Sequence, residues 1–182
     1  CSGLTIVFLF WTITLMARKV WMKEGEDAPW VNKIGVLLAG FVGAVAYTFT
    51  ESFWFNAVEG EVYAMSSLFT AITFWAILKW EQVADDPKSF RWFIFIAFLV
   101  GLSIGVHLLN LLCVPAIVYV VYFKKWKKTS VGGFVLAGVV SLVLLWFLNM
   151  FLVPQIINLA GKTELFFVNS LGAPFNMGAI VF

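Results

Sequence analysis

Glu59, Glu61 and His107 are the ionisable side chains of this sequence with the clearest potential for chemistry, because they lie between long apolar segments. Carboxylates and an imidazole can accept or donate protons, hold polar ligands and coordinate ions. An ionisable group in such surroundings is costly and usually has a function. Tyr63 and Asn110 bring a phenol and an amide within a few residues of these groups. These five residues form the candidate site.

No other motif with a defined chemistry stands out in the sequence. It has no cluster of Cys and His at metal-ligand spacing, no glycine-rich phosphate loop and no nucleophile motif. Its two cysteines, Cys1 and Cys113, lie in apolar sequence, and we expect both to be small buried side chains. The cofactor therefore stays open, with a divalent metal as one option.

Composition identifies the class of protein that must position these residues. The chain is 62% hydrophobic and 12% charged, with 20 Phe and 9 Trp. A soluble domain of this length could not bury that much apolar surface, so we predict an all-α, polytopic bundle of transmembrane helices. Its surroundings are then the lipid bilayer. The formal charge of +2 is too small to favour nucleic acid as a partner.

Long apolar runs predict membrane spans within a single transmembrane domain, residues 1–182. The spans are expected at about residues 2–17, 34–55, 62–78, 90–105, 108–123 and 131–153, followed by an external loop with an interfacial helix at 154–177. Pro154 is expected to end the last span. The chain starts within one apolar run and stops as another begins, so we expect it to be an internal part of a longer protein.

The run from Phe90 to Phe123 is too long for one crossing, since a single helix of that length would measure about 50 Å. Two crossings leave roughly 24 Å for each helix. We therefore expect the turn at 105–110, which holds His107, to be recessed below the outer surface, where protein or water must cover its backbone. Gly101 and Gly105 have the spacing that lets a neighbouring helix approach closely.

The basic residues orient the predicted spans. One side carries every Lys and Arg except Lys162, namely Arg18, Lys19, Lys23, Lys33, Lys79, Lys88, Arg91, Lys124, Lys125, Lys127 and Lys128. The positive-inside rule makes that side cytoplasmic. The opposite, external face then carries Glu51, Glu59, Glu61, His107, Asn110 and Glu164. The glutamates and the histidine are therefore predicted to share one face.

Each candidate also has a purely structural interpretation. Asn56 and Glu59 have the spacing of a capping box at the start of the third helix. Glu61 would point about 200° away from Glu59 on a helix, so the two glutamates would meet different neighbours. His107 could simply cap the helical turn, and Glu51 could be an interfacial residue without a role. The residues alone leave these interpretations open.

Four stretches of the chain carry a family resemblance. They are residues 53–64, with the pattern Asn-Ala-Val-Glu-x-Glu-Val-Tyr; residues 74–81; residues 101–110, with Gly-Leu-Ser-x-Gly-Val-His; and residues 166–170 together with 173–176. In these stretches the chain resembles a bacterial family of multispanning proteins long catalogued as a domain of unknown function. That family is related to the eukaryotic transmembrane protein O-mannosyltransferases and belongs to the GT-C glycosyltransferase superfamily.

The resemblance implies a GT-C-like membrane enzyme that takes a sugar from a polyprenyl-phosphate carrier and transfers it to a protein, a glycan or another acceptor on the non-cytoplasmic face. In such enzymes the catalytic acid usually follows the first span, so the resemblance implies that the principal acid lies upstream of Cys1. Glu59, Glu61, Tyr63, His107 and Asn110 would then bind substrate or support the site. They would face the periplasm of a bacterial inner membrane, and the segment alone is expected to be inactive.

Two other classes of protein stay open. Intramembrane acids and a histidine on recessed turns also suit a transporter or flippase, in which such groups relay protons or coordinate ions. A non-catalytic membrane scaffold is the third class. The enzyme is favoured because the acids are predicted near one surface and not at mid-depth, and because no inverted repeat is evident.

Overall fold

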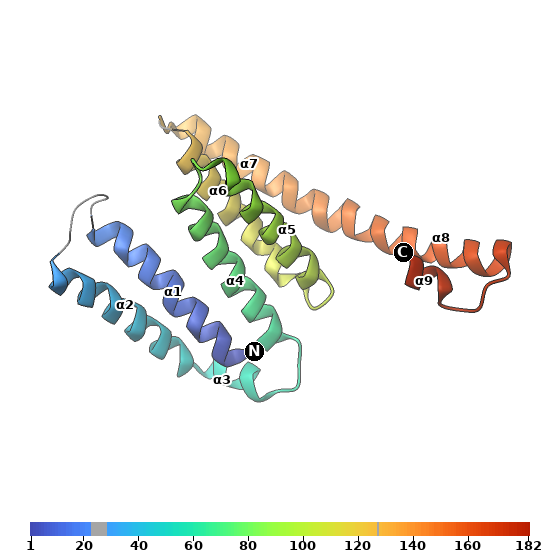
Figure 1. Cartoon of the computed structure of the whole chain (residues 1–182), viewed down its shortest axis with the longest axis horizontal. Coiled ribbons are helices and arrows are strands. Elements are labelled where there is room, and N and C mark those ends of the chain that lie inside the picture. Colours follow the sequence, from blue (N-terminus) through green and yellow to red (C-terminus); the bar gives the residue numbers. More distant parts are fainter. Residues whose placement is uncertain (23–28, 127) are drawn as a thin grey trace.

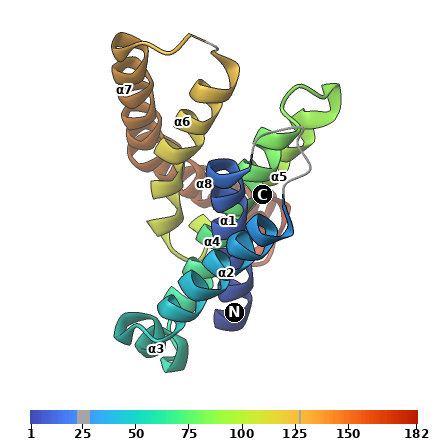
Figure 2. The ribbon, with the colours of Figure 1, turned by 90° about the vertical axis from the view of Figure 1, so that its left-hand side faces the viewer.

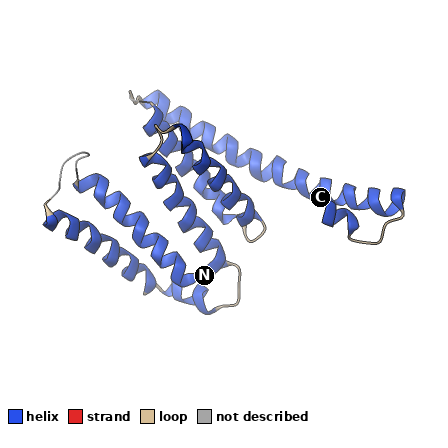
Figure 3. Ribbon diagram, viewed as in Figure 1, coloured by secondary structure: helices blue, strands red, loops and turns tan. Residues whose placement is uncertain are grey.

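The computed structural model describes residues 1–22, 29–126 and 128–182. Within these ranges every regular element is a helix and no strand occurs (Figure 3). Five of these helices are long and apolar enough to cross a membrane, and a sixth span results if the bent pair α3 and α4 is counted as one. The predicted all-α fold of transmembrane helices is therefore confirmed.

The first two helices, α1 (Ser2–Trp21) and α2 (Trp30–Thr48), lie side by side (Figure 1). A glycine of α2 makes their close approach possible, because a methyl group at Gly40 would collide with the Thr14 hydroxyl and the Phe10 ring of α1. Small residues at helix contacts let backbones approach in membranes, where packing and not the hydrophobic effect drives helix association.

The central helix is α4 (Tyr63–Gln82), which contacts α1, α5 (Phe90–Ile104) and α6 (Cys113–Lys125). Its Trp80 is buried and packs against Phe93 of α5, with ring centroids 4.7 Å apart. The other buried members of this cluster are Ala76, Ile77, Ala84 and Ile96. The best-packed part of the bundle therefore surrounds the C-terminal half of α4.

The predicted span 34–55 is not one helix. It ends at Thr48, and a separate helix, α3 (Glu51–Val58), follows; α3 and α4 then meet at an angle of 118°. The Thr48 and Thr50 hydroxyls donate to backbone carbonyls of the preceding turn, at 2.9 and 2.8 Å. Such side-chain bonds offer the backbone an alternative to the helix. Hydropathy averaged over the run does not reveal the break, because the apolar residues further out on both sides outweigh Glu51 and Ser52.

The long run 90–123 is divided by a turn at residues 105–107. A 3₁₀ helix, η2 (Leu108–Leu112), follows this turn and leads directly into α6. The expected close helix approach at Gly101 and Gly105 is wrong: among the described residues, no neighbouring helix lies within 4 Å of a methyl group placed at either glycine. The glycines are on the surface of α5 and at its end, not at a helix contact.

Close approach occurs instead between α6 and α7 (Val131–Phe147). A methyl group at Gly133 would collide with the Tyr122 ring, and one at Gly138 would lie 2.6 Å from the Tyr119 hydroxyl. The tyrosines of α6 thus fill the space that the α7 glycines leave. Packing between α6 and α7 depends on this match of large and small residues.

The sequence predicted that the helix would end at Pro154, but the helix continues past this residue. Helix α7 continues through a π-helical turn, η3 (Leu148–Leu152), into α8 (Val153–Leu171), giving a helical stretch of 41 residues. Pro154 lacks the N–H that would bond to a carbonyl of the preceding turn, and it directly follows the π-helical turn, a local irregularity within the continuous helix. The predicted loop 154–177 is therefore mostly helical, while its location at the membrane surface stays a prediction.

The end of α8 is joined to a short helix, α9 (Met177–Val181), that folds back against it (Figure 1). The Glu164 carboxylate accepts hydrogen bonds from the Asn176 and Ala179 backbone N–H groups, at 2.6 and 3.0 Å. Gly178 packs directly on the Glu164 backbone, where a methyl group would collide. Glu164 therefore holds a helical hairpin together.

Ion pairs join the helices at the end of the bundle where α1, α4 and α6 finish. Lys19 of α1 pairs with Glu81 of α4, and Lys124 of α6 lies 3.3 Å from Asp85. The Lys125 ammonium donates to the Ala84 carbonyl at 2.8 Å. Two of the basic residues used to orient the chain, Lys23 and Lys127, lie outside the described residues. The cytoplasmic location of this end stays a prediction.

We predict that Gly40→Leu lowers the thermal unfolding temperature of the detergent-purified protein, because a larger side chain forces α1 and α2 apart at a cost of about 1–3 kcal/mol. Gly101→Leu is the matched control, since this glycine is also helical but exposed, and leucine favours a helix over glycine. Equal unfolding temperatures for the two variants would show that the α1–α2 contact does not depend on Gly40.

Candidate functional site

Tyr63 and His107 meet at the end of the bundle opposite the ion pairs. Tyr63 is the first residue of α4, and His107 lies in the turn between α5 and η2. Their ring centroids are 5.4 Å apart, with the ring planes at 49°. The α3–α4 corner, seen below the bundle in Figures 1 and 2, and the α5–η2 turn thus bring together two candidates that are 44 positions apart in the sequence.

His107 has a structural task that fixes its hydrogen-bonding state. The imidazole Nδ1 accepts a hydrogen bond from the Leu109 backbone N–H at 3.0 Å. The backbone N–H of His107 donates to the Ser103 carbonyl at 2.8 Å. A neutral imidazole whose Nδ1 accepts must carry its proton on Nε2. His107 therefore caps η2, as the structural interpretation suggested, and its Nε2–H remains a donor for another group.

Asn110 is fully buried and belongs to a polar cluster inside the bundle. Its amide nitrogen donates to the Ser103 hydroxyl at 3.0 Å and to the Thr73 hydroxyl at 3.4 Å, while its oxygen accepts from the Cys113 thiol at 3.2 Å. These contacts link α4, α5, η2 and α6. Asn110 therefore fastens the helices beneath the His107 turn and does not line its surface.

The two glutamates lie in the link between α3 and α4. Glu59 is half-buried and Glu61 is exposed, and no hydrogen bond or ion pair joins either carboxylate to another described residue. The proposed capping box is wrong, because Asn56 lies inside α3 and Glu59 is the C-terminal cap of that helix. Neither Asn56 nor Glu59 therefore caps the start of α4.

The part of the chain that the structure describes contains no preformed metal site. No group of three His, Cys, Asp or Glu side chains is close enough together there to hold an ion. Of the two cysteines, Cys113 is buried as expected, whereas Cys1 is exposed. The expectation for Cys1 is wrong because this residue precedes α1 and has no helix packed over it.

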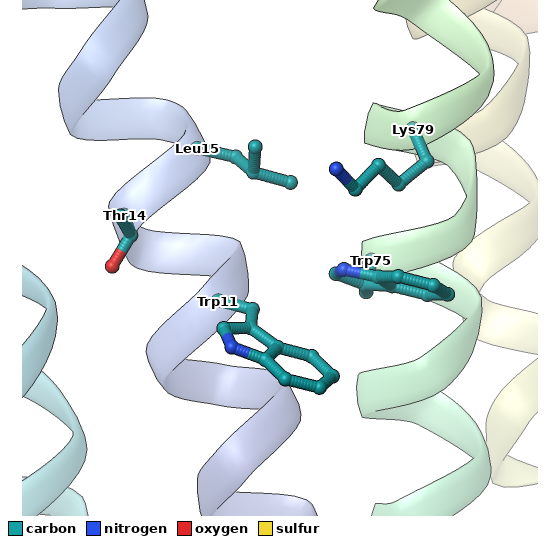
Figure 4. Close-up of a pocket in the computed structure, with 5 residues that line it drawn as sticks. All are labelled: Trp11, Thr14, Leu15, Trp75 and Lys79. Atoms are coloured by element: carbon teal, nitrogen blue, oxygen red, sulfur yellow. The ribbon is translucent and has the colours of Figure 1, made fainter.

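Sequence reasoning missed a groove between α1 and α4 (Figure 4). It is lined by Trp11, Thr14, Leu15, Trp75 and Lys79 and has a volume of about 260 Å³. Trp11 and Leu15 on α1, and Trp75 and Lys79 on α4, are each four positions apart and so share a helix face. That spacing was visible in the sequence, but the packing of α1 against α4 was not.

We predict that Asn110→Leu destabilises the detergent-purified protein by about 1 kcal/mol, because it leaves buried hydroxyls and a thiol without their partner. Thermal unfolding measures the change. Asn169→Leu, on the exposed surface of α8, is the control and should have little effect. An unfolding temperature for Asn110→Leu as high as that of the control would exclude a fastening role for the cluster.

Comparison with known proteins identifies the family of this chain. Residues 1–130 match the model of the protein O-mannosyl-transferase TMEM260 N-terminal domain. The match covers α1 to α6, and with them Glu59, Glu61, Tyr63, His107 and Asn110. No curated protein and no solved structure matches the chain. The predicted relation to transmembrane protein O-mannosyltransferases is thus confirmed, and the chain belongs to the TMEM260 N-terminal domain family.

Proposed function

We propose that this chain is part of an integral-membrane glycosyltransferase that takes mannose or a related sugar from a polyprenyl-phosphate carrier and transfers it to an acceptor hydroxyl on the non-cytoplasmic face. The observation that carries the proposal is the match of residues 1–130 to a protein O-mannosyl-transferase domain. The candidate acceptors are a protein or a glycan. The carrier tail would lie among the apolar helices, where the bilayer is its natural solvent.

The arrangement of ionisable groups supports this proposal. His107 and the α3–α4 link lie at one end of the bundle, and the paired lysines lie at the other. If the basic end is cytoplasmic, Glu59, Glu61 and His107 face the compartment in which the acceptor is found. In a bacterial cell this compartment is the periplasm.

His107 and Tyr63 suit substrate binding better than proton abstraction. With Nδ1 occupied by the Leu109 N–H, the Nε2–H of His107 can donate to a sugar hydroxyl or to a phosphate oxygen. The Tyr63 ring stands beside it and gives a sugar ring an apolar surface, while its hydroxyl supplies a further donor. Asn110 would support this pair indirectly, because its amide donates to the Ser103 hydroxyl and the Ser103 carbonyl accepts from the His107 backbone N–H.

The glutamates would bind sugar hydroxyls, a divalent metal, or the loop that carries the principal acid. An acceptor hydroxyl needs a base to remove its proton as it attacks the sugar. In the glycosyltransferases that this chain resembles, that acid usually follows the first span, and we propose that here it lies upstream of Cys1. Glu59 and Glu61 are then supporting residues, since neither is held by another described side chain and both are available to a ligand.

We predict that Glu59→Gln or Glu61→Gln in the full-length protein lowers the rate of sugar transfer from a polyprenyl-linked donor by about tenfold, the effect of roughly 1.4 kcal/mol of lost binding in the transition state. Transfer is measured with purified protein in vesicles. Glu51→Gln is the control, because Glu51 is exposed at the start of α3 on the same face. Unchanged transfer in both variants would remove these glutamates from the site.

We predict that His107→Asn lowers transfer by a similar factor while leaving the unfolding temperature near that of the wild type. An asparagine oxygen can still accept the Leu109 N–H and so preserve the cap of η2, but the Nε2–H and the ring beside Tyr63 are lost. His107→Ala should lose both activity and stability. Full activity in His107→Asn would limit His107 to its capping role.

The transporter interpretation is tested by the same preparation. Purified full-length protein that moves a solute or a lipid across vesicles without consuming any lipid-linked sugar would overturn the enzyme proposal. Sugar transfer that depends on Glu59 or Glu61 would support it.

A further inference from the structure

The groove between α1 and α4 lies far from the candidate site, near the end of the bundle that carries the ion pairs. Lys79 is in the last turn of α4, two residues before Glu81, which pairs with Lys19 of α1. The groove opens just inside this ion pair, where its walls come from α1 and α4 only. Its Lys79 end therefore lies near that end of the two helices, while Trp11 lies about halfway along α1.

The groove combines one cation with aromatic walls. Figure 4 shows the Lys79 side chain extending from α4 toward Leu15 of α1, above the Trp75 ring, with Trp11 lower on α1, while the Thr14 hydroxyl points away toward α2. That hydroxyl donates to the Phe10 carbonyl, so the Lys79 ammonium is the charged group directed into the groove. Within the described residues, no carboxylate lies within 4 Å of it.

An aromatic row extends the wall along the bundle. Phe8 and Trp11 of α1 contact Trp75 of α4, with ring centroids 5.3 and 5.9 Å apart, and Trp75 contacts Trp92 of α5 at 5.7 Å. Trp11 is 42% exposed, so the row is open to the surroundings. The row therefore extends from the Lys79 end of the groove toward the middle of α1, where hydrocarbon surrounds a helix that spans a bilayer.

We propose that this groove binds an anionic phospholipid of the adjacent leaflet, with its phosphate at the Lys79 ammonium and its acyl chains along Trp11 and Trp75. Charge complementarity identifies the occupant: a single ammonium in an apolar groove at a membrane surface suits a monoanionic phosphate attached to a hydrocarbon body. Basic pockets between helices on the cytoplasmic side of membranes bind anionic headgroups in this way. The bound lipid would stabilise the α1–α4 contact, which has few buried side chains here.

Native mass spectrometry of the detergent-purified protein tests the proposal, with phosphatidylglycerol and phosphatidylcholine of equal chain length as probes. The wild type should retain phosphatidylglycerol preferentially, and Lys79→Met should reduce its retention about fivefold, the effect of one lysine near an anionic surface. Lys88→Met is the control, because Lys88 is an exposed cation at the same end of the bundle but outside the groove. It should retain the preference.

Three results would overturn the proposal. They are equal retention of the two lipids by the wild type, unchanged retention by Lys79→Met, and an equal loss in Lys88→Met, which would indicate diffuse surface charge. Displacement of phosphatidylglycerol by polyprenyl phosphate in a Lys79-dependent manner would assign the groove to the donor lipid and also overturn it. If Lys79→Met does not fold, Trp11→Leu gives the second test: it should weaken phosphatidylglycerol retention, and unchanged retention would exclude the groove.

Discussion

Every backbone N–H and C=O group inside a bilayer must be paired within the protein, and this constraint governs where the chain can leave a helix. The breaks in the apolar part of the chain occur where a side chain or a modified turn supplies a partner. Thr48 and Thr50 donate to carbonyls where α2 ends, and the His107 imidazole accepts the Leu109 N–H where α5 gives way to η2. His107 of the candidate site lies at the second of these breaks, so its position follows from the way in which that break is satisfied.

Helix α4 connects the two regions to which we assign functions. Its first residue, Tyr63, meets His107, while Trp75 and Lys79 near its other end form the groove with α1. Between them, Thr73 takes part in the buried cluster around Asn110, and Trp80, next to Lys79, anchors the apolar core. Helix α4 contacts α1, α5 and α6, so packing against three neighbours sets its position. One helix thus contributes both to the candidate site and to the groove, which lie toward opposite ends of the bundle.

The errors made from the sequence have a common physical origin. Hydropathy averaged over 34–55 predicted one span because apolar residues outweigh the polar stretch from Thr48 to Ser52. The proline rule ended a span at Pro154, although a π-helical turn carries the helix past the proline. The glycine pattern at Gly101 and Gly105 suggested a close contact between helices, whereas the helices approach closely at Gly40, Gly133 and Gly138. In each case the deciding factor was a hydrogen bond or a neighbour supplied by folding, which a sequence pattern does not contain.

The sequence by itself determined the class of protein, the approximate places of the helices and the family of the chain, because hydrophobicity, charge and motif are properties of short stretches that sum along the chain. It also named Tyr63, His107 and Asn110. Only the tertiary structure decided that Tyr63 and His107 touch, that Asn110 is buried with Ser103 and Thr73, and that Trp11 and Lys79 share a groove. These meetings depend on how far each helix is rotated and how closely it approaches its neighbour, and both are set by side-chain packing between segments distant in the sequence.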